Sequence, residues 1–377
     1  MSNNTLIITG IRGIPARHGG FETFAEHLSR YLVNRNWKVI VYIQEKGKGG
    51  LSQSEWYQIQ RIHIPIVTAG PFSTVIFDLK SIINSVGYGK SVILTLGYNT
   101  AVFNLLYRLK GKYNIINMDG IEWKRQKWGY GAKLWFLLNE QLACWFGNHL
   151  VADHPNISER LTKRAACRKI SMIPYGAREI IQADESILKE YNLKKYKYAI
   201  LIARAEPENS ILEIVTAFSL RKIDAKLVVL GSYKPDENKY HQLVMAAANC
   251  EVIFPGSIYD ATTVDALRFF ARFYIHGHQV GGTNPSLVEA LGAGNAVLAH
   301  DNEFNRWVAQ DGAIYFHDTF SAASSIQQLF ADDSMIEKLQ KASRKNFQTN
   351  FQLDDILSLY EKILLDGMED QCNKYST

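Results

Sequence analysis

The chain has 377 residues, of which 47% are hydrophobic and 21% are charged. This length exceeds one ordinary hydrophobic core and predicts two globular domains. The net charge of +5, from 42 basic and 37 acidic residues, favours an anionic ligand or a membrane surface. It does not require nucleic acid, which we do not expect as a partner.

Two further features of the composition indicate the compartment. The four cysteines have no short paired spacing, which argues against a zinc site or a disulfide framework and fits a reducing cytoplasm. No stretch approaches about 18 uninterrupted apolar residues, and the N-terminal apolar run is shorter than that of a signal peptide. We therefore expect a cytoplasmic protein, with peripheral contact on the inner face of the cell membrane as the alternative.

The first half of the chain alternates predicted strands and helices. TLIIT (5–9) reads as a buried strand, FETFAEHLSRYLVN (21–34) has apolar residues at helical spacing, and WKVIVYI (37–43) is the next strand. Apolar runs at 91–97 and 113–120 supply further strands. This order predicts a parallel, doubly wound sheet in a domain spanning 1–176.

The second half repeats the same alternation after a break at residues 171–186. Predicted strands and helices follow one another from KYAILIA (197–203) to NAVLAHD (295–301). We expect a second Rossmann-like domain at 177–355, with a C-terminal helix at about 356–377 packing back on the first domain. The predicted fold class is α/β, with two facing doubly wound domains and a ligand cleft between them.

The loop GIRGIPARHGGFE (10–22) follows the first strand. Gly19 and Gly20 lead into a predicted helix, whose N-terminal N–H groups attract anions, and Arg12 and Arg17 add positive charge. A tight turn without a ligand is the alternative. The glycine spacing differs from the dinucleotide fingerprint, which argues against a nicotinamide enzyme.

The loop ARAEPENSILE (203–213) places Arg204 between a strand and a helix. A cation at the carboxyl end of a strand suits a diphosphate, whereas a surface ion pair with a nearby glutamate is the alternative. Ser210 and Glu213 have the spacing of a capping box at the start of the helix.

The loop HGHQVGGTNPSLVEALGAG (276–294) opens another predicted helix. Asn284 can cap it, with Pro285 in the first position. Glu289 then lies one turn inside, where it could accept hydrogen bonds from the paired hydroxyls of a ribose, or be an ordinary exposed glutamate. The residues before the cap would aim free N–H groups at a ligand: Gly281, Gly282 and Thr283.

The stretch NMDGIEWKRQKWGYGAKLWF (117–136) ends a predicted strand of the first domain. Asp119 and Glu122 could orient an acceptor hydroxyl, and Trp123 beside Arg125 could stack on a sugar or touch anionic lipid. Helix capping by Asp119 and core packing of the tryptophans are the alternatives.

In this order the motifs resemble the retaining glycosyltransferases of family 4, which have the GT-B fold. More narrowly, residues 10–24, 117–129, 203–210 and 277–292 resemble the bacterial rhamnosyltransferase group that builds cell-surface polysaccharides of the cell envelope. The resemblance covers almost the whole chain. It implies an acceptor-binding first domain and a second domain that binds the nucleotide sugar.

The resemblance also implies a reaction. We expect transfer of L-rhamnose from dTDP-β-L-rhamnose, with retention, to a saccharide acceptor carried on a polyprenyl diphosphate. Another nucleotide sugar, such as a UDP- or GDP-sugar, and a non-catalytic nucleotide-sugar-binding partner are the alternatives. The chain has no Asp-x-Asp motif, so we expect neither a metal nor another cofactor.

Two positions depart from the family pattern. The family has two glutamates eight positions apart, of which the second matches Glu289 while the first is replaced by Gly281. Its arginine and lysine phosphate pair becomes Arg204 and Asn209. A different sugar or a backbone contact would explain the first change. The missing lysine charge could come from the arginines of the first loop, or from His276 or His278.

The resemblance and the motifs together predict three groups of site residues. The catalytic residues are Asp119, Glu122 and Arg204, and the acceptor residues are Asp119, Trp123 and Arg125. The donor-binding residues are Arg12, Arg17, Gly19, Gly20, Arg204, Gly256, Ile258, His278, Gly281, Gly282, Thr283, Asn284 and Glu289, with Gly256 and Ile258 near the base.

Overall fold

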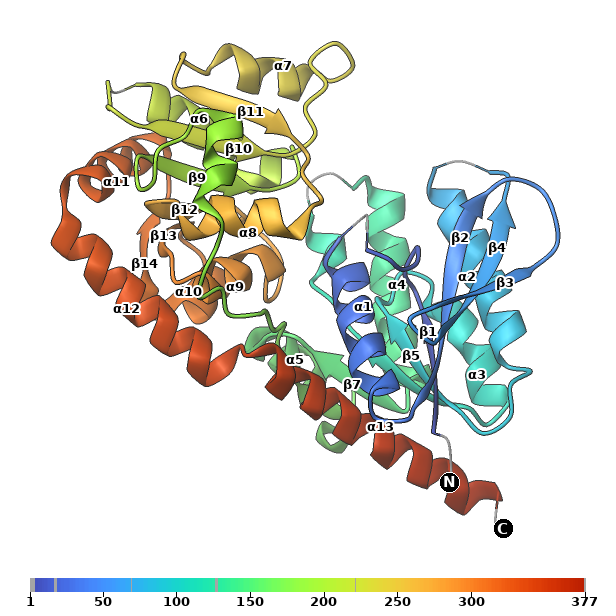
Figure 1. Ribbon diagram of the computed structural model, residues 1–377. Helices are drawn as coiled ribbons and strands as arrows, with labels where there is room; N and C mark the ends of the chain where they lie inside the picture. Colours follow the sequence, from blue (N-terminus) through green and yellow to red (C-terminus); the bar gives the residue numbers. More distant parts are fainter. Residues whose placement is uncertain (1–3, 17–18, 69, 126–127, 221, 376–377) are drawn as a thin grey trace. The chain divides into compact units, whose positions relative to one another are not determined.

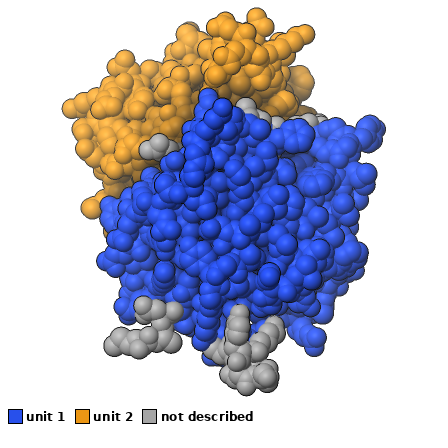
Figure 2. Space-filling view, turned by 90° about the vertical axis from the view of Figure 1, so that its right-hand side faces the viewer, with its two compact units in different colours: residues 1–174, 354–377 blue, residues 175–353 orange. Residues whose placement is uncertain are grey.

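The computed structural model describes residues 4–16, 19–68, 70–125, 128–220 and 222–375. It consists of two compact units, which Figures 1 and 2 show: residues 1–174 with 354–377 (unit 1), and residues 175–353 (unit 2). The sequence analysis placed the two domain boundaries after residues 176 and 355, and the structure places them after residues 174 and 353. Among the described helices, none has the length and apolarity needed to cross a membrane.

In its described part, unit 1 contains an eight-stranded sheet in the order β3-β4-β2-β1-β5-β6-β7-β8. The strands are β1 (Thr5–Thr9), β2 (Lys38–Lys46), β3 (Ser52–Trp56), β4 (Ile59–Ile66), β5 (Val92–Leu96), β6 (Tyr113–Asn117), β7 (His149–Ala152) and β8 (Ile170–Met172). Neighbouring strands pair in parallel, except for the antiparallel pair β3 and β4. The strand order reverses between β1 and β5.

The helices of unit 1 cover this sheet. They are α1 (Gly20–Val33), α2 (Pro71–Ser85), η1 (Ala101–Asn104), α3 (Leu105–Leu109), η2 (Glu122–Lys124), α4 (Tyr130–Phe146), α5 (Pro155–Thr162), η3 (Cys167–Lys169) and α13 (Leu353–Tyr375). The predicted helix at 21–34 is confirmed as α1, which buries Phe24 and Leu28 on one side.

The C-terminal helix α13 is held on unit 1 by polar and aromatic contacts. Trp37 donates through Nε1 to Glu361 at 3.2 Å, and Asn117 donates through Nδ2 to the hydroxyl of Tyr360 at 2.8 Å. The rings of Tyr360 and Phe24 lie 4.5 Å apart, so α13 runs beside α1 (Figure 1).

Unit 2 has a six-stranded parallel sheet among its described residues, in the order β11-β10-β9-β12-β13-β14. The strands are β9 (Tyr198–Ile202), β10 (Lys226–Leu230), β11 (Val252–Gly256), β12 (Phe273–His276), β13 (Ala296–His300) and β14 (Ala313–Phe316). The helices are η4 (Glu185–Tyr191), η5 (Pro207–Asn209), α6 (Ile211–Ser219), α7 (Lys239–Ala246), α8 (Ala261–Phe269), α9 (Pro285–Gly292), α10 (Glu303–Ala309), η6 (Gln310–Gly312), α11 (Thr319–Ala331) and α12 (Asp333–Asn350). Numbered along the chain, the strand order is that of a Rossmann fold.

Strand β9 shows why this sheet is buried on both faces. Its alternate residues Ala199 and Leu201 pack in one cluster with residues of α6 and α11, whereas Tyr198 and Ile200 pack on the other face with residues of η4 and α8. A strand with helices on both faces needs a continuous apolar run, such as AILI at 199–202. The predicted class of two Rossmann-like α/β domains is confirmed.

The carboxyl group of Asp78 is buried in unit 1. Asp78 of α2 accepts a hydrogen bond from the hydroxyl of Thr100 at 2.8 Å, in the segment that follows β5. Burial raises the pKa of Asp78 to about 7, although the hydrogen bond from Thr100 opposes this. The folded protein therefore holds a proton there that the unfolded chain releases near pH 4.

We expect Asp78→Asn to stabilise the protein at pH 8 and to leave its stability unchanged near pH 4. Because the folded pKa is raised, the contribution of Asp78 is complete below the unfolded pKa and is lost as pH rises to about 7. Asparagine keeps an acceptor for Thr100 without this loss. A rise of about three pKa units corresponds to about 4 kcal/mol, so the gain in unfolding free energy at pH 8 should be of that order.

Urea unfolding at both pH values measures the difference, with the exposed Asp224→Asn as the control. A variant that is less stable than the parent at pH 8 would show that the fold uses the charge of Asp78.

Candidate functional site

In each unit, the order of the strands reverses at one point. In unit 2 this point lies between β9 and β12, whose carboxyl ends continue into residues 203–210 and 277–284. We call these two segments the switch-point loops. Ligands of open α/β sheets bind in the crevice where such loops diverge.

The switch-point loops are tied together by close backbone contact. A Cβ atom at Gly277 would lie 2.1 Å from the carbonyl oxygen of Asn209, so a side chain there would force the loops apart. Ser210 donates to the carbonyl of Gly277 at 2.8 Å, and Gln279 donates through Nε2 to Ser210 at 3.0 Å. The loops therefore form one rigid platform beyond the two strands.

The predicted capping box at Ser210 is wrong. Ser210 is in the left-handed region, with φ of 50°, and its side chain caps no N–H of α6. Its hydroxyl is used to bridge to Gly277 instead, a contact across 67 positions of sequence. Local spacing with Glu213 gives no sign of that partner.

Arg204 lies exposed in the first switch-point loop. Its guanidinium makes no hydrogen bond or ion pair with a described residue, so the alternative of a pair with a nearby glutamate is not observed there. Asn209, which stands where the family has lysine, is 3% exposed and donates to the carbonyl of Arg204 at 2.8 Å. Asn209 thus holds the backbone that presents the arginine.

The second switch-point loop ends in the capped helix α9. Asn284 accepts through its side chain from the backbone N–H of Ser286 at 3.0 Å, with Pro285 in the first position, which confirms the predicted cap. Before the cap, Thr283 is buried, whereas Gly281 has φ of +148° and no atom near its missing Cβ. Gly282 is half-buried.

Glu289 has a partner that its sequence neighbourhood does not reveal. Arg268, at the end of α8 and almost fully buried, forms an ion pair with Oε2 of Glu289 and also reaches Ser286. The Glu289 side chain is 32% exposed, so the pair leaves part of the carboxylate accessible. A guanidinium behind a carboxylate fixes its orientation toward solvent or a ligand.

Three histidines gather at the carboxyl ends of β12 and β13. His276 is 1% exposed and its ring stacks on that of His278, with centroids 4.4 Å apart. Burial, followed by His278 and His300, holds the pKa of His276 well below its ordinary value, so the ring is neutral. Neither of its ring nitrogens has a hydrogen-bond partner among the described residues.

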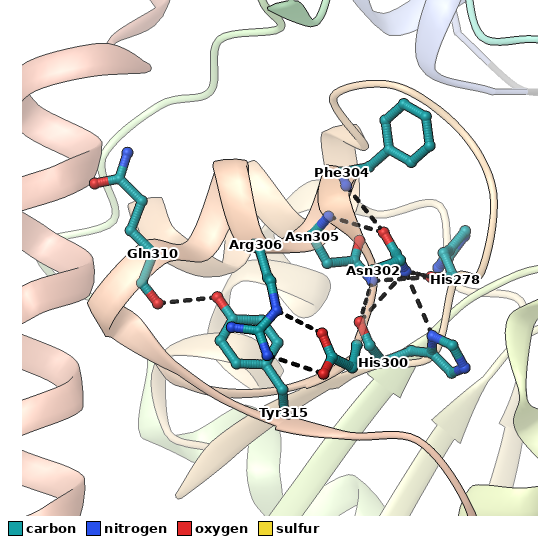
Figure 3. A network of polar contacts seen from close by, with 9 residues as sticks. His278, His300, Asn302, Phe304, Asn305, Arg306, Gln310 and Tyr315 are labelled. Carbon is teal, nitrogen blue, oxygen red and sulfur yellow. Dashed lines mark hydrogen bonds and ion pairs between the residues drawn. The ribbon is translucent and has the colours of Figure 1, made fainter. Parts of the chain in front are cut away.

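Asparagines of α10 support this histidine group (Figure 3). Asn302 and Asn305 each donate to the carbonyl of His278 at 2.9 Å, and Asn305 also donates to the carbonyl of His300 at 2.8 Å. The backbone of the second switch-point loop is therefore anchored on the neighbouring strand. The motif DNEFN (301–305) after a strand was a signal that the sequence prediction did not use.

The positions predicted for the base lie farther along the same edge of the sheet. Gly256 ends β11 with φ of +90°, and the half-buried Ile258 packs against the core on the α8 side. The described site of unit 2 thus combines the exposed cation Arg204, the glycines before the capped helix α9 and the neutral imidazole of His276. This set can hold an anion with uncharged groups beside it.

In unit 1 the loop after β1 is also closely packed. A Cβ atom at Gly10 would lie 2.3 Å from the carbonyl oxygen of Leu96, and φ there is +84°. Arg12 is exposed, while its backbone carbonyl accepts from Gln44 at 2.8 Å. Arg17 lies outside the described residues.

A carboxylate occupies the start of α1, where an anion was expected. Glu22, in the first turn, is 8% exposed and accepts from the backbone N–H of Arg12 at 3.4 Å. Its Oε2 atom lies 3.4 Å from the position of a Cβ at Gly19, and Gly20 begins the helix. A phosphate bound by these glycines would lie next to this negative charge, which weakens such an interaction.

Asp119 follows β6 by two residues. It has φ of +51°, and its backbone N–H donates to the side chain of Asn117 at 3.0 Å. Its carboxylate makes no hydrogen bond or ion pair with a described residue and caps no described helix. It lines a small pocket within unit 1 together with Tyr98, Glu140 and Arg160.

The predicted catalytic residue Glu122 and the predicted acceptor residues Trp123 and Arg125 form side-chain contacts within unit 1. Glu122 is 8% exposed and pairs with Arg125 at 2.9 Å. Trp123 donates through Nε1 to Glu140 at 2.6 Å, and the guanidinium of Arg160 lies 4.9 Å from its ring centre. These contacts leave Asp119 as the accessible acid of this segment.

Comparison with known proteins agrees with this architecture. Residues 183–346 match the family Glycosyl transferases group 1, and residues 3–178 match Domain of unknown function DUF1972. No curated protein matches the chain by sequence.

Solved structures with a similar fold extend over the whole chain. Sucrose-phosphate synthase from Thermosynechococcus elongatus has a TM-score of 0.79 at 16% identity, covering 97% of this chain and 100% of that one. HepE from Anabaena, in complex with UDP and glucose, has a TM-score of 0.75 at 12% identity, covering 96% and 99%. An α,α-trehalose 6-phosphate synthase from Burkholderia multivorans has a TM-score of 0.72 at 8% identity, covering 100% of both.

The chain therefore has the GT-B fold, with its first half matching the DUF1972 family model and its second half matching the model of glycosyl transferases group 1.

Proposed function

We propose that the protein is a retaining glycosyltransferase that moves L-rhamnose from dTDP-β-L-rhamnose to a saccharide acceptor carried on a polyprenyl diphosphate. The observation that carries the transfer reaction is the platform of switch-point loops in unit 2. It presents the exposed Arg204 beside the capped helix α9, with Glu289 one turn inside that helix. A diphosphate and a ribose are the two parts of a nucleotide sugar that such groups bind.

The chemistry of the step is stabilisation of a leaving diphosphate. Arg204 and the backbone N–H groups of Gly282 and Thr283 would stabilise the negative charge that develops as the bond to the sugar breaks. The departing phosphate oxygen takes up the proton of the incoming hydroxyl on the same face of the sugar, and the configuration is retained. Asp119 would orient that hydroxyl on the acceptor side.

The choice of rhamnose rests on the likeness of the four motifs to the rhamnosyltransferase group. Gly281, in place of a glutamate, supports a donor sugar that needs no carboxylate at this point. A UDP-sugar is the second candidate, because HepE binds UDP and glucose and trehalose-phosphate synthases of similar fold form UDP.

We expect dTDP and dTDP-rhamnose to raise the melting temperature more than UDP, GDP or ADP at equal concentration. A ligand that binds only the folded state stabilises it more, at a given concentration, the lower its Kd is. A thermal-shift series with these nucleotides, followed by transfer assays with the matching sugars, measures this preference. A larger shift with UDP would select the second candidate, and a purine preference would exclude both.

We expect Arg204→Ala to lower kcat/KM by the equivalent of about 2–4 kcal/mol while the melting temperature stays unchanged. Arg204 is exposed and has no described side-chain partner, so its loss should not affect folding. Lys197→Ala is the matched control, because Lys197 is an exposed cation that precedes the opposite end of the same strand, β9. Equal kcat/KM for the two variants would remove Arg204 from the site.

We expect Asp119→Asn to lower transfer by roughly 100-fold or more, with dTDP affinity unchanged. Asparagine tolerates the left-handed backbone of this position as well as aspartate does, so the substitution tests the charge and not the fold. Transfer rate and dTDP affinity are measured on one preparation, with the exposed Glu55→Gln as the control. Full activity would exclude a role for the carboxylate in transfer.

A further inference from the structure

Helix α4 exposes an apolar stripe on the surface of unit 1. The side chains of the stripe are 37% to 95% exposed, and they are Tyr130, Leu134, Leu137, Leu138 and Trp145. Their spacing places them on one side of an α-helix. Isolated apolar side chains are common on protein surfaces, but a row along a helix of 17 residues is not.

The opposite side of α4 is fixed to unit 1, so the stripe has a defined outward direction. Asn139 accepts from the backbone N–H of Val102 at 2.9 Å, and the buried Glu140 pairs with Arg160 and Arg164, each at 2.9 Å. Rotation of the helix to bury the stripe would break these contacts and expose a buried carboxylate.

The neighbouring helix α3 packs against α4 and carries exposed apolar and basic side chains of its own. Its Leu105 and Leu109 are 41% and 71% exposed, and Arg108 and Lys110 beside them are exposed as well. We call the stripe of α4 together with Leu105, Arg108 and Leu109 of α3 and the following Lys110 the docking surface.

The docking surface is basic. The only acidic residue within α3 and α4 is Glu140, which is buried and paired. Near the C-terminal end of α4, Lys169 donates to the carbonyl of Cys144 at 3.2 Å. Its pKa is lowered by burial and then by Arg108 and Arg168, which places these cations close to one another.

We propose that the docking surface binds the face of an anionic lipid bilayer, with α4 lying along the bilayer plane. An apolar stripe with cations beside it, on two helices that carry no exposed acid, is the chemistry of an interfacial helix. The apolar side of such a helix enters the acyl boundary while the cations meet anionic headgroups. A protein partner with a mixed surface would not select for the absence of acids.

Docking on a membrane would bring a lipid-linked acceptor close to Asp119. This consequence rests on the proposed function. Glu140, on the inward side of α4, lines the same pocket as Asp119. A bilayer held against the outer side of α4 would therefore lie one helix away from the residue that orients the acceptor hydroxyl. A lipid-linked saccharide could reach Asp119 while its lipid stays in the membrane.

The test is co-sedimentation of the full chain with vesicles, without donor or acceptor. We expect binding to phosphatidylcholine vesicles containing 30% phosphatidylglycerol, and much weaker binding to pure phosphatidylcholine. Leu134→Glu and Trp145→Glu should each lower the partition coefficient about tenfold or more, because each removes one large apolar side chain from the lipid. Phe320→Glu is the matched control, since Phe320 of α11 in unit 2 is 79% exposed.

The cations are tested separately. Arg108→Gln and Lys110→Gln should each weaken binding to the anionic vesicles about fivefold, and salt should do the same, with little effect on neutral vesicles. Circular dichroism and melting temperature establish that each variant is folded, which is expected because the substituted side chains are exposed.

Three outcomes would overturn the proposal: no binding by the parent protein, equal binding by the Leu134→Glu and Phe320→Glu variants, or a dimer in solution that Leu134→Glu dissociates and that binds no vesicles. The last would assign the docking surface to a second copy of the chain. A protein that binds vesicles as expected but transfers no sugar would retain the docking and refute the proposed function.

Discussion

Both sheets depend on close approach of two backbone segments where the strand order reverses. In unit 1, Gly10 leaves β1 against the carbonyl of Leu96, and in unit 2, Gly277 leaves β12 against the carbonyl of Asn209. A Cβ at either place would lie within 2.3 Å of an oxygen atom. Since ligands of such folds bind at these points, the residue that permits the packing also shapes the site.

The sequence was sufficient to predict the fold because its signals are local. Buried parallel strands need continuous apolar runs such as AILI, and a covered helix needs apolar residues at its own period, as in α1. The cap of α9 was also predictable, because Asn284 and Pro285 are adjacent to the N–H groups that they satisfy. Each of these features is decided within a few residues.

The sequence indicated which loops form the site, but not which residues the side chains of those loops contact. Arg268 reaches Glu289 across 21 positions and Ser210 reaches Gly277 across 67, and no short spacing announces either contact. The same limit applies in unit 1, where the glycines before α1 suggested an anion but Glu22 already lies in the first turn. A loop motif identifies an end of a strand, whereas the fold determines which polar groups remain available there.

Within each of two segments, some polar side chains are paired with other residues of the protein and others are not. In residues 117–125, Glu122 is committed to Arg125 and Trp123 to Glu140, while the carboxylate of Asp119 has no partner among the described residues. In residues 203–210, Asn209 and Ser210 hold backbone carbonyls, while the guanidinium of Arg204 is unengaged by the described chain. The paired groups hold these loops in place, and the carboxylate of Asp119 and the guanidinium of Arg204 then remain available to a ligand. Such an arrangement is expected where a loop must be rigid and its functional group must still bind something other than the protein.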